Sequence, residues 1–359
     1  MSAKEKKMWS GVAALSCVVL AVFVFIFLNE TVIYYSRAHA DTATSSALVR
    51  VQATLDTVAY DNKMLALAHV NLASTTATST ASSTKVRLWP VHAVYPIGGA
   101  LLPFNRIVAY YGNFYSTAMG VLGQYPPDVV LQKLRAAVAQ WQAADPSTPV
   151  IPAIDYIAVT AQGSAGKDGM YRARMPDSQI DKAIDMAKQV NGIVFLDVQV
   201  GLSNVQSEIP ALKKYLAMPQ VNLAIDPEFS MKDGTPPGRE IGTFDATDIN
   251  YVANYLAQLV RDNNLPPKIL VVHRFTEDMV THYRQIKPLP EVQIVMDMDG
   301  WGFGAKKINT YNSVIYPEPV QFTGFKLFYK ADLRPPSTRM LTPQEVLKLT
   351  PAPSFIQYQ

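Results

Sequence analysis

From residue 106 to the C-terminus, short runs rich in β-branched and aromatic residues alternate with segments of helical periodicity. This alternation is typical of a parallel sheet built from strand–helix–strand units. The runs number eight, at residues 106–112, 150–157, 192–200, 221–228, 268–275, 291–299, 323–329 and 355–359. Helical patterns separate them, at about residues 128–144, 178–190, 206–216, 246–263, 277–285, 305–311 and 342–348. The pattern predicts an α/β fold, a closed (β/α)8 TIM barrel of roughly 250 residues, and not an open doubly wound sheet.

The N-terminal region carries an apolar run at residues 8–28 that contains no charged residue. At 1.5 Å per residue its length matches a hydrocarbon layer of about 30 Å. Lysines are concentrated before the run, so the positive-inside rule predicts a cytoplasmic tail at 1–7 and a single-pass anchor in the cell membrane. The barrel would then lie outside the cytoplasm. Two alternatives are a signal peptide cleaved after the A-x-A motif at 38–40 and lipid attachment at Cys17, although Cys17 lies in the middle of the run.

Two segments connect this anchor to the barrel. Apolar residues recur at spacings of three, four and seven between residues 45 and 73, which predicts an amphipathic helix that serves as a stalk or for self-association. Residues 74–84 contain only Ser, Thr and Ala, which indicates a solvated linker. The expected organisation is therefore a stalk and linker at 29–84, a lead-in segment at 85–105 and a barrel domain at 106–359.

Composition excludes several classes of protein. With 49% hydrophobic and 17% charged residues, the chain is neither disordered nor a coiled coil. Lys+Arg 32 against Asp+Glu 29 gives a formal net charge of only +3, which argues against nucleic acid as a partner. A single cysteine rules out an intrachain disulfide and a cysteine metal cluster.

Polar residues gather at the carboxyl ends of the predicted strands, where the active sites of such barrels are built. They are Asp155, Asp197, Gln199, Asp226, Glu228, His273, Asp297 and Asp299. Side chains on a strand alternate between its two faces, so each Asp-x-Asp, Asp-x-Gln or Asp-x-Glu pair shares one face. The apolar residues between them would face the surrounding helices, which directs the polar pairs into the barrel mouth.

Carboxylates that converge in this way raise one another's pKa. A neutral carboxylic acid beside an ionised carboxylate is the pair that cleavage of a glycosidic bond requires. We expect Glu228, as the outermost inward residue of its strand, to be the proton donor. Asp226, Asp197 and Asp299 are the other catalytic candidates, and the substrate-binding candidates are Asp155, Gln199, His273 and Asp297. The alternative is a structural plug in which these carboxylates are hydrogen-bonded and inert.

Aromatic residues near the predicted mouth suit the apolar faces of sugar rings. The binding candidates are Trp301, Tyr111, Tyr329 and Tyr358. Trp301 stands between two glycines in a loop that follows a strand, which favours contact with a ligand over a place in the core.

Two short pieces of the sequence resemble a known family. Asp226-Pro227-Glu228 resembles the D-x-E end of the signature of chitinase-like glycoside hydrolases, and residues 295–300 are similar to that family's M-x-Y-D segment. Asn222, Ala224 and Met298 replace other residues of the signature, so the likeness applies to the wider superfamily of glycoside hydrolase barrels. It implies a barrel that cleaves polysaccharide with carboxylates and needs no cofactor.

Other chemistries fit less well. A His-x-His pair on the first strand is missing, which argues against a His-rich metal site, while an Asp-only site for a hard cation stays open. No metal or other cofactor is therefore predicted. The sequence predicts an exported, membrane-tethered glycosidase that acts on a cell-surface or extracellular polysaccharide. The alternative is a barrel of the cell envelope that binds glycan without cleaving it.

Overall fold

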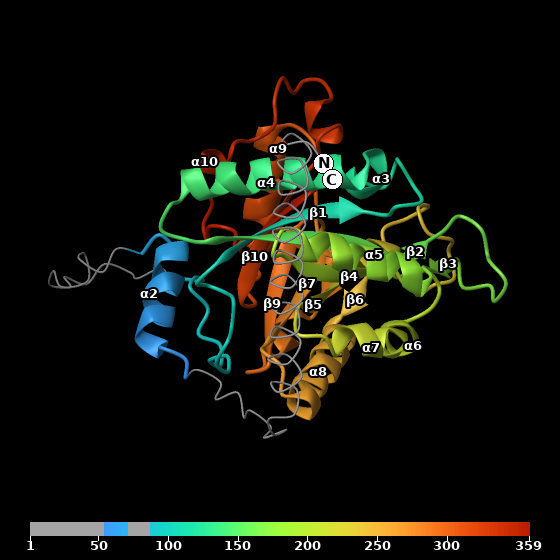
Figure 1. The fold of residues 1–359 in the computed structure, drawn as a ribbon, viewed down its shortest axis with the longest axis horizontal. Coiled ribbons are helices and arrows are strands. Elements are labelled where there is room, and N and C mark those ends of the chain that lie inside the picture. Colours follow the sequence, from blue (N-terminus) through green and yellow to red (C-terminus); the bar gives the residue numbers. More distant parts are fainter. Residues whose placement is uncertain (1–53, 71–86) are drawn as a thin grey trace, which may run out of the picture. The chain divides into compact units, whose positions relative to one another are not determined.

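The computed structural model describes residues 54–70 and 87–359. Its centre is a barrel of parallel strands that pair in chain order (Figure 1). The strands are β1 (Arg106–Gly112), β2 (Val150–Ala161), β4 (Ile193–Val198), β5 (Val221–Ile225), β7 (Lys268–Arg274), β9 (Val292–Met298), β10 (Phe322–Leu327) and β11 (Phe355–Tyr358). β1 pairs with both β2 and β11, so the sheet closes. The predicted eight-stranded TIM barrel is confirmed, with strand ends that differ by a few residues.

The barrel interior changes from apolar to polar along the strands. Its apolar part contains Ile107, Ala109, Ala153, Phe195, Ala224, Ile269, Val271, Val295, Phe322 and Phe355. Many of these apolar residues are followed, two positions later and on the same face of the strand, by a polar residue. Examples are Asp197 after Phe195 and His273 after Val271. The amino-terminal end is therefore packed with hydrocarbon, and the polar residues collect at the carboxyl end.

Three long helices cover the barrel where the sequence predicts them. They are α4 (Pro127–Ala144), α5 (Asp177–Lys188) and α8 (Ala246–Asn263). Proline at the first position begins α4, and Asp245 and Asp248 form a capping box at the start of α8. Their buried faces pack against the outward side chains of the strands in the larger hydrophobic cluster.

The other connections are shorter. The helix predicted at 206–216 is divided into α6 (Val205–Glu208), a 3-10 turn (Pro210–Leu212) and α7 (Lys213–Leu216), because Pro210 has no N–H for the helical ladder. The remaining helices are α3 (Val121–Gln124), α9 (Gly304–Thr310), a π-helical turn (Tyr311–Ile315), a 3-10 turn (Ala331–Leu333) and α10 (Pro343–Val346). β3 (Arg172–Arg174) folds back antiparallel on β2.

The helix predicted at 277–285 is wrong. The segment forms two 3-10 turns (Glu277–Met279 and Tyr283–Gln285) around the short strand β8 (Val280–Thr281). β8 pairs with β6 (Phe244–Asp245) before α8. The Thr281 hydroxyl and His282 Nδ1 contact Asp245 Oδ2 at 2.8 and 2.6 Å. These contacts with a distant residue outweigh the weak helical preference of the segment.

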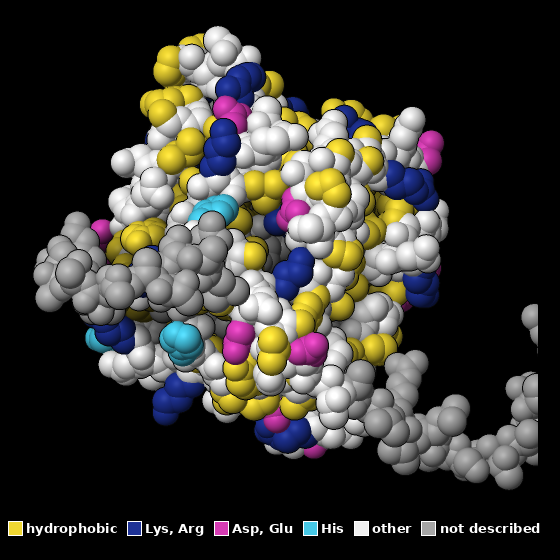
Figure 2. All heavy atoms as spheres, turned by 90° about the vertical axis from the view of Figure 1, so that its left-hand side faces the viewer, with side chains coloured by type: hydrophobic (Ala, Val, Ile, Leu, Met, Phe, Trp, Pro, Cys, Tyr) yellow, Lys and Arg dark blue, Asp and Glu magenta, His cyan; other side chains and the backbone are white. Residues whose placement is uncertain are grey.

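Helix α2 (Thr57–Leu67) lies within the segment expected to be a stalk. Its Tyr60 and Met64 are buried with the apolar residues of the barrel interior, and Ala352 N donates a 2.7 Å hydrogen bond to Leu67 O. α2 therefore closes the amino-terminal end of the barrel and does not stand apart from it. Figure 2 views the molecule from this side, where acidic, basic and hydrophobic side chains are interspersed.

The predicted cytoplasmic tail, membrane span and Ser/Thr/Ala linker lie outside the described residues. Within residues 54–70 and 87–359, no helix has both the length and the apolar character needed to cross a bilayer.

Candidate active site

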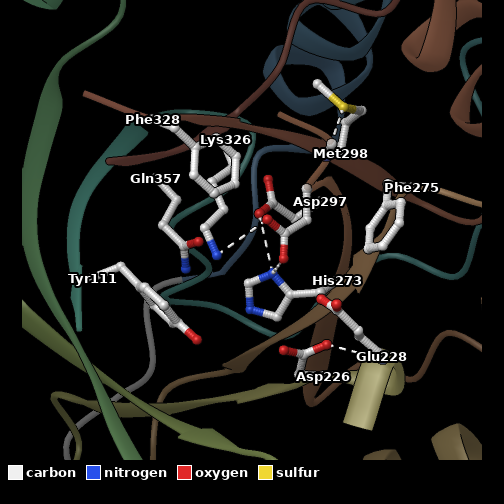
Figure 3. A network of polar contacts seen from close by, with 12 residues as sticks. Tyr111, Asp226, Glu228, His273, Phe275, Asp297, Met298, Lys326, Phe328 and Gln357 are labelled. Atoms are coloured by element: carbon white, nitrogen blue, oxygen red, sulfur yellow. Dashed lines mark hydrogen bonds and ion pairs between the residues drawn. The ribbon is translucent and has the colours of Figure 1, made fainter. Parts of the chain in front are cut away.

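A cavity of about 450 Å³ opens at the carboxyl ends of the strands. It is lined by several of the predicted site residues: Tyr111, Gln199, Asp226, Glu228, Asp299 and Trp301. Side chains that the sequence did not single out complete the lining, among them Met119, Phe275, Lys326 and Phe328. Figure 3 shows side chains from different strands that point towards one another at this mouth.

Asp226 and Glu228 reach the cavity by a different route from the one predicted. β5 ends at Ile225, and residues Pro227–Phe229 form a 3-10 turn, so Glu228 is not on a strand. Asp226 caps this turn: its Oδ1 accepts a 3.0 Å hydrogen bond from the backbone N–H of Glu228. The cap holds the half-buried Glu228 side chain at the cavity wall.

Four of the predicted residues lie beneath the cavity and are fully buried: Asp155, Asp197, His273 and Asp297. His273 Nε2 lies 2.8 Å from Asp197 Oδ2, and its Nδ1 lies 3.2 Å from Asp299 Oδ2. Gln357 Nε2 donates a 2.6 Å hydrogen bond to Asp155 Oδ2. These residues form a polar layer that supports the cavity floor and do not line the cavity themselves.

Lys326 is the main residue that the sequence analysis missed. It is buried, and its Nζ lies 3.1 Å from Asp299 Oδ1 and 3.8 Å from the centre of the Tyr111 ring. The signal for it was present, because a lysine between Phe325 and Leu327 in an apolar strand takes the inward face by alternation. It supplies a cation to the cluster of carboxylates.

Tyr329 and Tyr358, which the sequence predicts to bind substrate, are not among the residues that line the cavity. Both belong to the layer between the barrel and α4, where their rings stack with centroids 5.2 Å apart. The Tyr358 hydroxyl accepts a 2.9 Å hydrogen bond from Trp141 Nε1 of α4, and the Tyr329 hydroxyl lies 2.7 Å from that of Tyr110. Phe355 and Gln357 take the inward positions of β11, so Tyr358 must face outward.

The environments of Glu228 and Asp299 move their pKa values in opposite directions. Burial, together with the charge of Asp299, raises the pKa of Glu228 to about 7. Burial alone would also raise the pKa of Asp299, but Lys326 and His273 outweigh it and lower the value. Below about pH 7 these shifts favour a protonated Glu228 beside an ionised Asp299, which is the division of roles between acid and base.

Burial also governs the neighbouring groups. It raises the pKa values of Asp155, Asp226 and Asp297. For His273 burial acts in the other direction, yet the adjoining aspartates raise its pKa well above the usual value. His273 is thus a buried imidazolium that balances part of the negative charge.

In the described part of the chain, no group of three His, Cys, Asp or Glu side chains is placed to hold a metal ion. The cations of the cluster are those of Lys326 and His273.

Comparisons with known proteins return distant likenesses only. No family model and no curated protein matches the chain. Among solved structures it is similar to "Cellulase Cel5C_n", with 14% identity and a TM-score of 0.35 over 62% of this chain and 65% of that one. It is also similar to a GH18 chitinase from Pseudoalteromonas aurantia, with 11% identity and a TM-score of 0.26 over 70% and 79% of the two chains. The chain spans 65% of the cellulase's length.

Proposed function

We propose that the protein is a glycoside hydrolase that cleaves a polysaccharide with Glu228 as proton donor and Asp299 as the ionised carboxylate. The observation that supports this most is that both carboxyls line one cavity while Asp299 lies 3.1 Å from Lys326 Nζ and 3.2 Å from His273 Nδ1, a setting that displaces the two pKa values in opposite directions. Glycosidic cleavage needs this pair, because one group must give a proton and the other must stay negative.

In this mechanism Glu228 gives its proton to the glycosidic oxygen as the C–O bond breaks. The ionised Asp299, between Lys326 and His273, faces the positive charge that develops at the anomeric carbon. Water then adds to that carbon, and its proton restores the acid form of Glu228. The reaction thus consumes one water molecule for each glycosidic bond that is cleaved.

Asp226 and Asp197 take supporting roles in this proposal. Asp226 positions Glu228 by accepting its backbone N–H, and its Oδ2 lies 3.4 Å from Gln199 Nε2 at the cavity wall. Asp197 is buried beneath the floor and acts through His273, which in turn lies against Asp299. Both are positioning residues, whereas the sequence alone placed them among the catalytic candidates.

The place of action is proposed from the sequence. The apolar run at 8–28 and the lysines before it would anchor the chain in the cell membrane and export the barrel. The substrate would then be a polysaccharide of the cell surface or the surroundings.

The test is to incubate the full chain with a panel of polysaccharides and to measure the reducing ends released. We expect release by the wild-type chain and almost none by Glu228→Gln. Complete inactivity across the panel would overturn the proposal. Equal binding of one glycan by both chains, with the glycan intact after long incubation, would instead identify a barrel that only binds glycan.

A further inference from the structure

Trp301 forms part of the cavity wall and yet is 48% exposed. It lies in the loop between β9 and α9. The Lys306 ammonium lies 4.8 Å, and the Arg334 guanidinium 5.2 Å, from the centre of the Trp301 ring. An exposed indole at the rim of the cavity thus lies within cation–π distance of two cations from different segments of the chain.

A buried ion pair holds this rim in place. Asp332 Oδ1 accepts a 3.0 Å hydrogen bond from Gly302 N, next to Trp301, and Asp332 Oδ2 lies 2.8 Å from Lys307 Nζ. Lys307 Nζ also donates a 2.7 Å hydrogen bond to the backbone oxygen of Lys326. The loop of Trp301 is therefore tied to the strand that supplies the cation of the active site. A rim fixed in this way loses little conformational freedom when a ligand binds.

Within residues 54–70 and 87–359, neither of the two cations beside Trp301 is paired with a carboxylate. In the described residues, the nearby Arg339 is paired with Glu345 at 2.7 Å, and Lys326 with Asp299 at 3.1 Å. Lys306 and Arg334 take part in no such pair within that same part of the chain, and their charged groups lie against the indole. Two positive charges at the rim are thus free to meet an anion.

We infer that Trp301, Lys306 and Arg334 form an outer subsite for a sugar unit that carries a carboxylate, so that the substrate is an acidic polysaccharide. The inference rests on the proposed function, since it names the substrate class of the same cavity. A carboxylate forms charge-assisted hydrogen bonds with ammonium and guanidinium groups, which are stronger than exposed cation–π contacts. It therefore draws both cations off the indole and leaves an aromatic face for the sugar ring.

A neutral sugar gains less free energy than an acidic sugar from binding at this rim. To stack on Trp301 it must displace a cation and offers no charge in return. Inside the cavity the acidic unit would meet the anion of Asp299, whose nearest cations, Lys326 and His273, are already paired with it. The geometry thus holds the acidic unit at the rim and presents a linkage further along the glycan to Glu228.

The test measures binding of polysaccharide without cleavage, and it therefore uses the full chain with the Glu228→Gln substitution. Polygalacturonate and alginate are titrated, each beside its carboxyl-reduced form, in which the same backbone has lost its charge. We expect at least one acidic polymer to bind roughly 10- to 100-fold more tightly than its reduced form, and added salt to weaken that binding.

Substitution then locates the source of the preference. Lys306→Gln with Arg334→Gln should abolish it by weakening binding of the acidic polymer, while binding of the reduced polymer should not weaken. The control is Lys188→Gln with Arg261→Gln, which removes two exposed, ion-paired cations at the opposite end of the barrel. This control should keep the preference, and unchanged melting midpoints show that the variants are folded.

The outcomes separate the two proposals. Equal binding of both forms, no binding of either acidic polymer, or a preference that survives the double substitution would overturn the acidic subsite, even if neutral glycans are cleaved. Selective binding that depends on Lys306 and Arg334, with no reducing ends released by the wild-type chain, would support the subsite and overturn the hydrolase.

Discussion

Lys326 Nζ lies 3.1 Å from Asp299 Oδ1; Lys326 belongs to β10, and Asp299 directly follows the adjacent strand β9. Both are almost completely buried, so water screens the pair weakly. The other oxygen of Asp299 lies 3.2 Å from His273 Nδ1. Asp299 is therefore held as an anion between two cations.

Lys326→Met should raise the pKa of Asp299 and shift the acidic limb of the pH–rate profile to higher pH, because Asp299 must be ionised to act. A buried charge without its partner should also cost about 3–5 kcal/mol of stability. Lys326→Arg, which keeps the charge, is the control. An acidic limb that does not move in Lys326→Met would show that Lys326 does not control Asp299.

Glu228→Gln keeps the size and hydrogen-bonding capacity of the side chain but removes its proton. Turnover should fall by about 10²–10⁴, with binding of glycan retained. Glu277→Gln changes an exposed glutamate and should leave turnover unchanged. A Glu228→Gln chain that is destabilised but turns over normally would mark Glu228 as a structural residue.

The pH dependence of turnover should follow the same group. Since Glu228 acts in its protonated form and its pKa is raised to about 7, kcat/KM should decline above about pH 7. The pH–rate profile of the wild-type chain checks this directly. A rate that stays constant up to pH 9 would exclude Glu228 as the proton donor.

Stability should depend on pH through Glu228 as well. Its pKa in the folded chain, about 7, is above the ordinary value of 4.5. The stabilisation is thus complete below about pH 4.5 and is lost as the pH rises through 7. Relative to Glu228→Gln, the wild-type chain should lose roughly 1–3 kcal/mol of unfolding free energy over this range. Denaturant unfolding at pH 4.5 and pH 8 measures the difference, and an increase would contradict the assignment.

Two tyrosines on opposite sides of the barrel wall should respond differently to loss of the hydroxyl. Tyr358→Phe removes the acceptor of Trp141 Nε1 and should cost about 1–3 kcal/mol of stability without affecting turnover. Tyr111→Phe removes the hydroxyl to which Gln199 Nε2 donates at 3.2 Å in the cavity wall, and it should lower turnover. Melting curves and rates of both variants are compared. Reduced turnover in Tyr358→Phe alone would return Tyr358 to the site.

The role of α2 can be tested through Met64, which is buried against the amino-terminal end of the barrel. Met64→Ala should cost about 2–5 kcal/mol of stability, as expected for a methionine in a core. Met170→Ala, at an exposed position, should change stability by no more than about 0.5 kcal/mol. Equal effects of the two substitutions would show that α2 does not belong to the core.

The barrel could be predicted from the sequence because each barrel strand and each long helix has its own local pattern of apolar and polar residues. Val194, Leu196 and Val198 face outward into the cluster with the helices, so the inward phase of Asp197 follows from period two alone. The same reasoning brought Asp226 and Asp299 to the mouth of the barrel. It also led to Glu228, although that residue reaches the cavity from a turn.

Other features depend on partners that are distant in the chain. The residues at 277–285 have a helical pattern, but Asp245 holds Thr281 and His282 in another conformation. No local pattern shows that Tyr60 and Met64 pack beneath the barrel. The predicted membrane span at 8–28 stays a prediction.

By itself, the sequence determined the eight barrel strands, the three long helices and the collection of carboxylates at one end of the barrel, since periodicity and strand direction are properties of neighbouring residues. Only the tertiary structure decided in which direction the pKa of each of those carboxylates is shifted. A pKa depends on burial and on nearby charges, and these come from distant parts of the sequence: Asp299 follows β9 and raises the pKa of Glu228, while Lys326 of β10 and His273 of β7 lower that of Asp299.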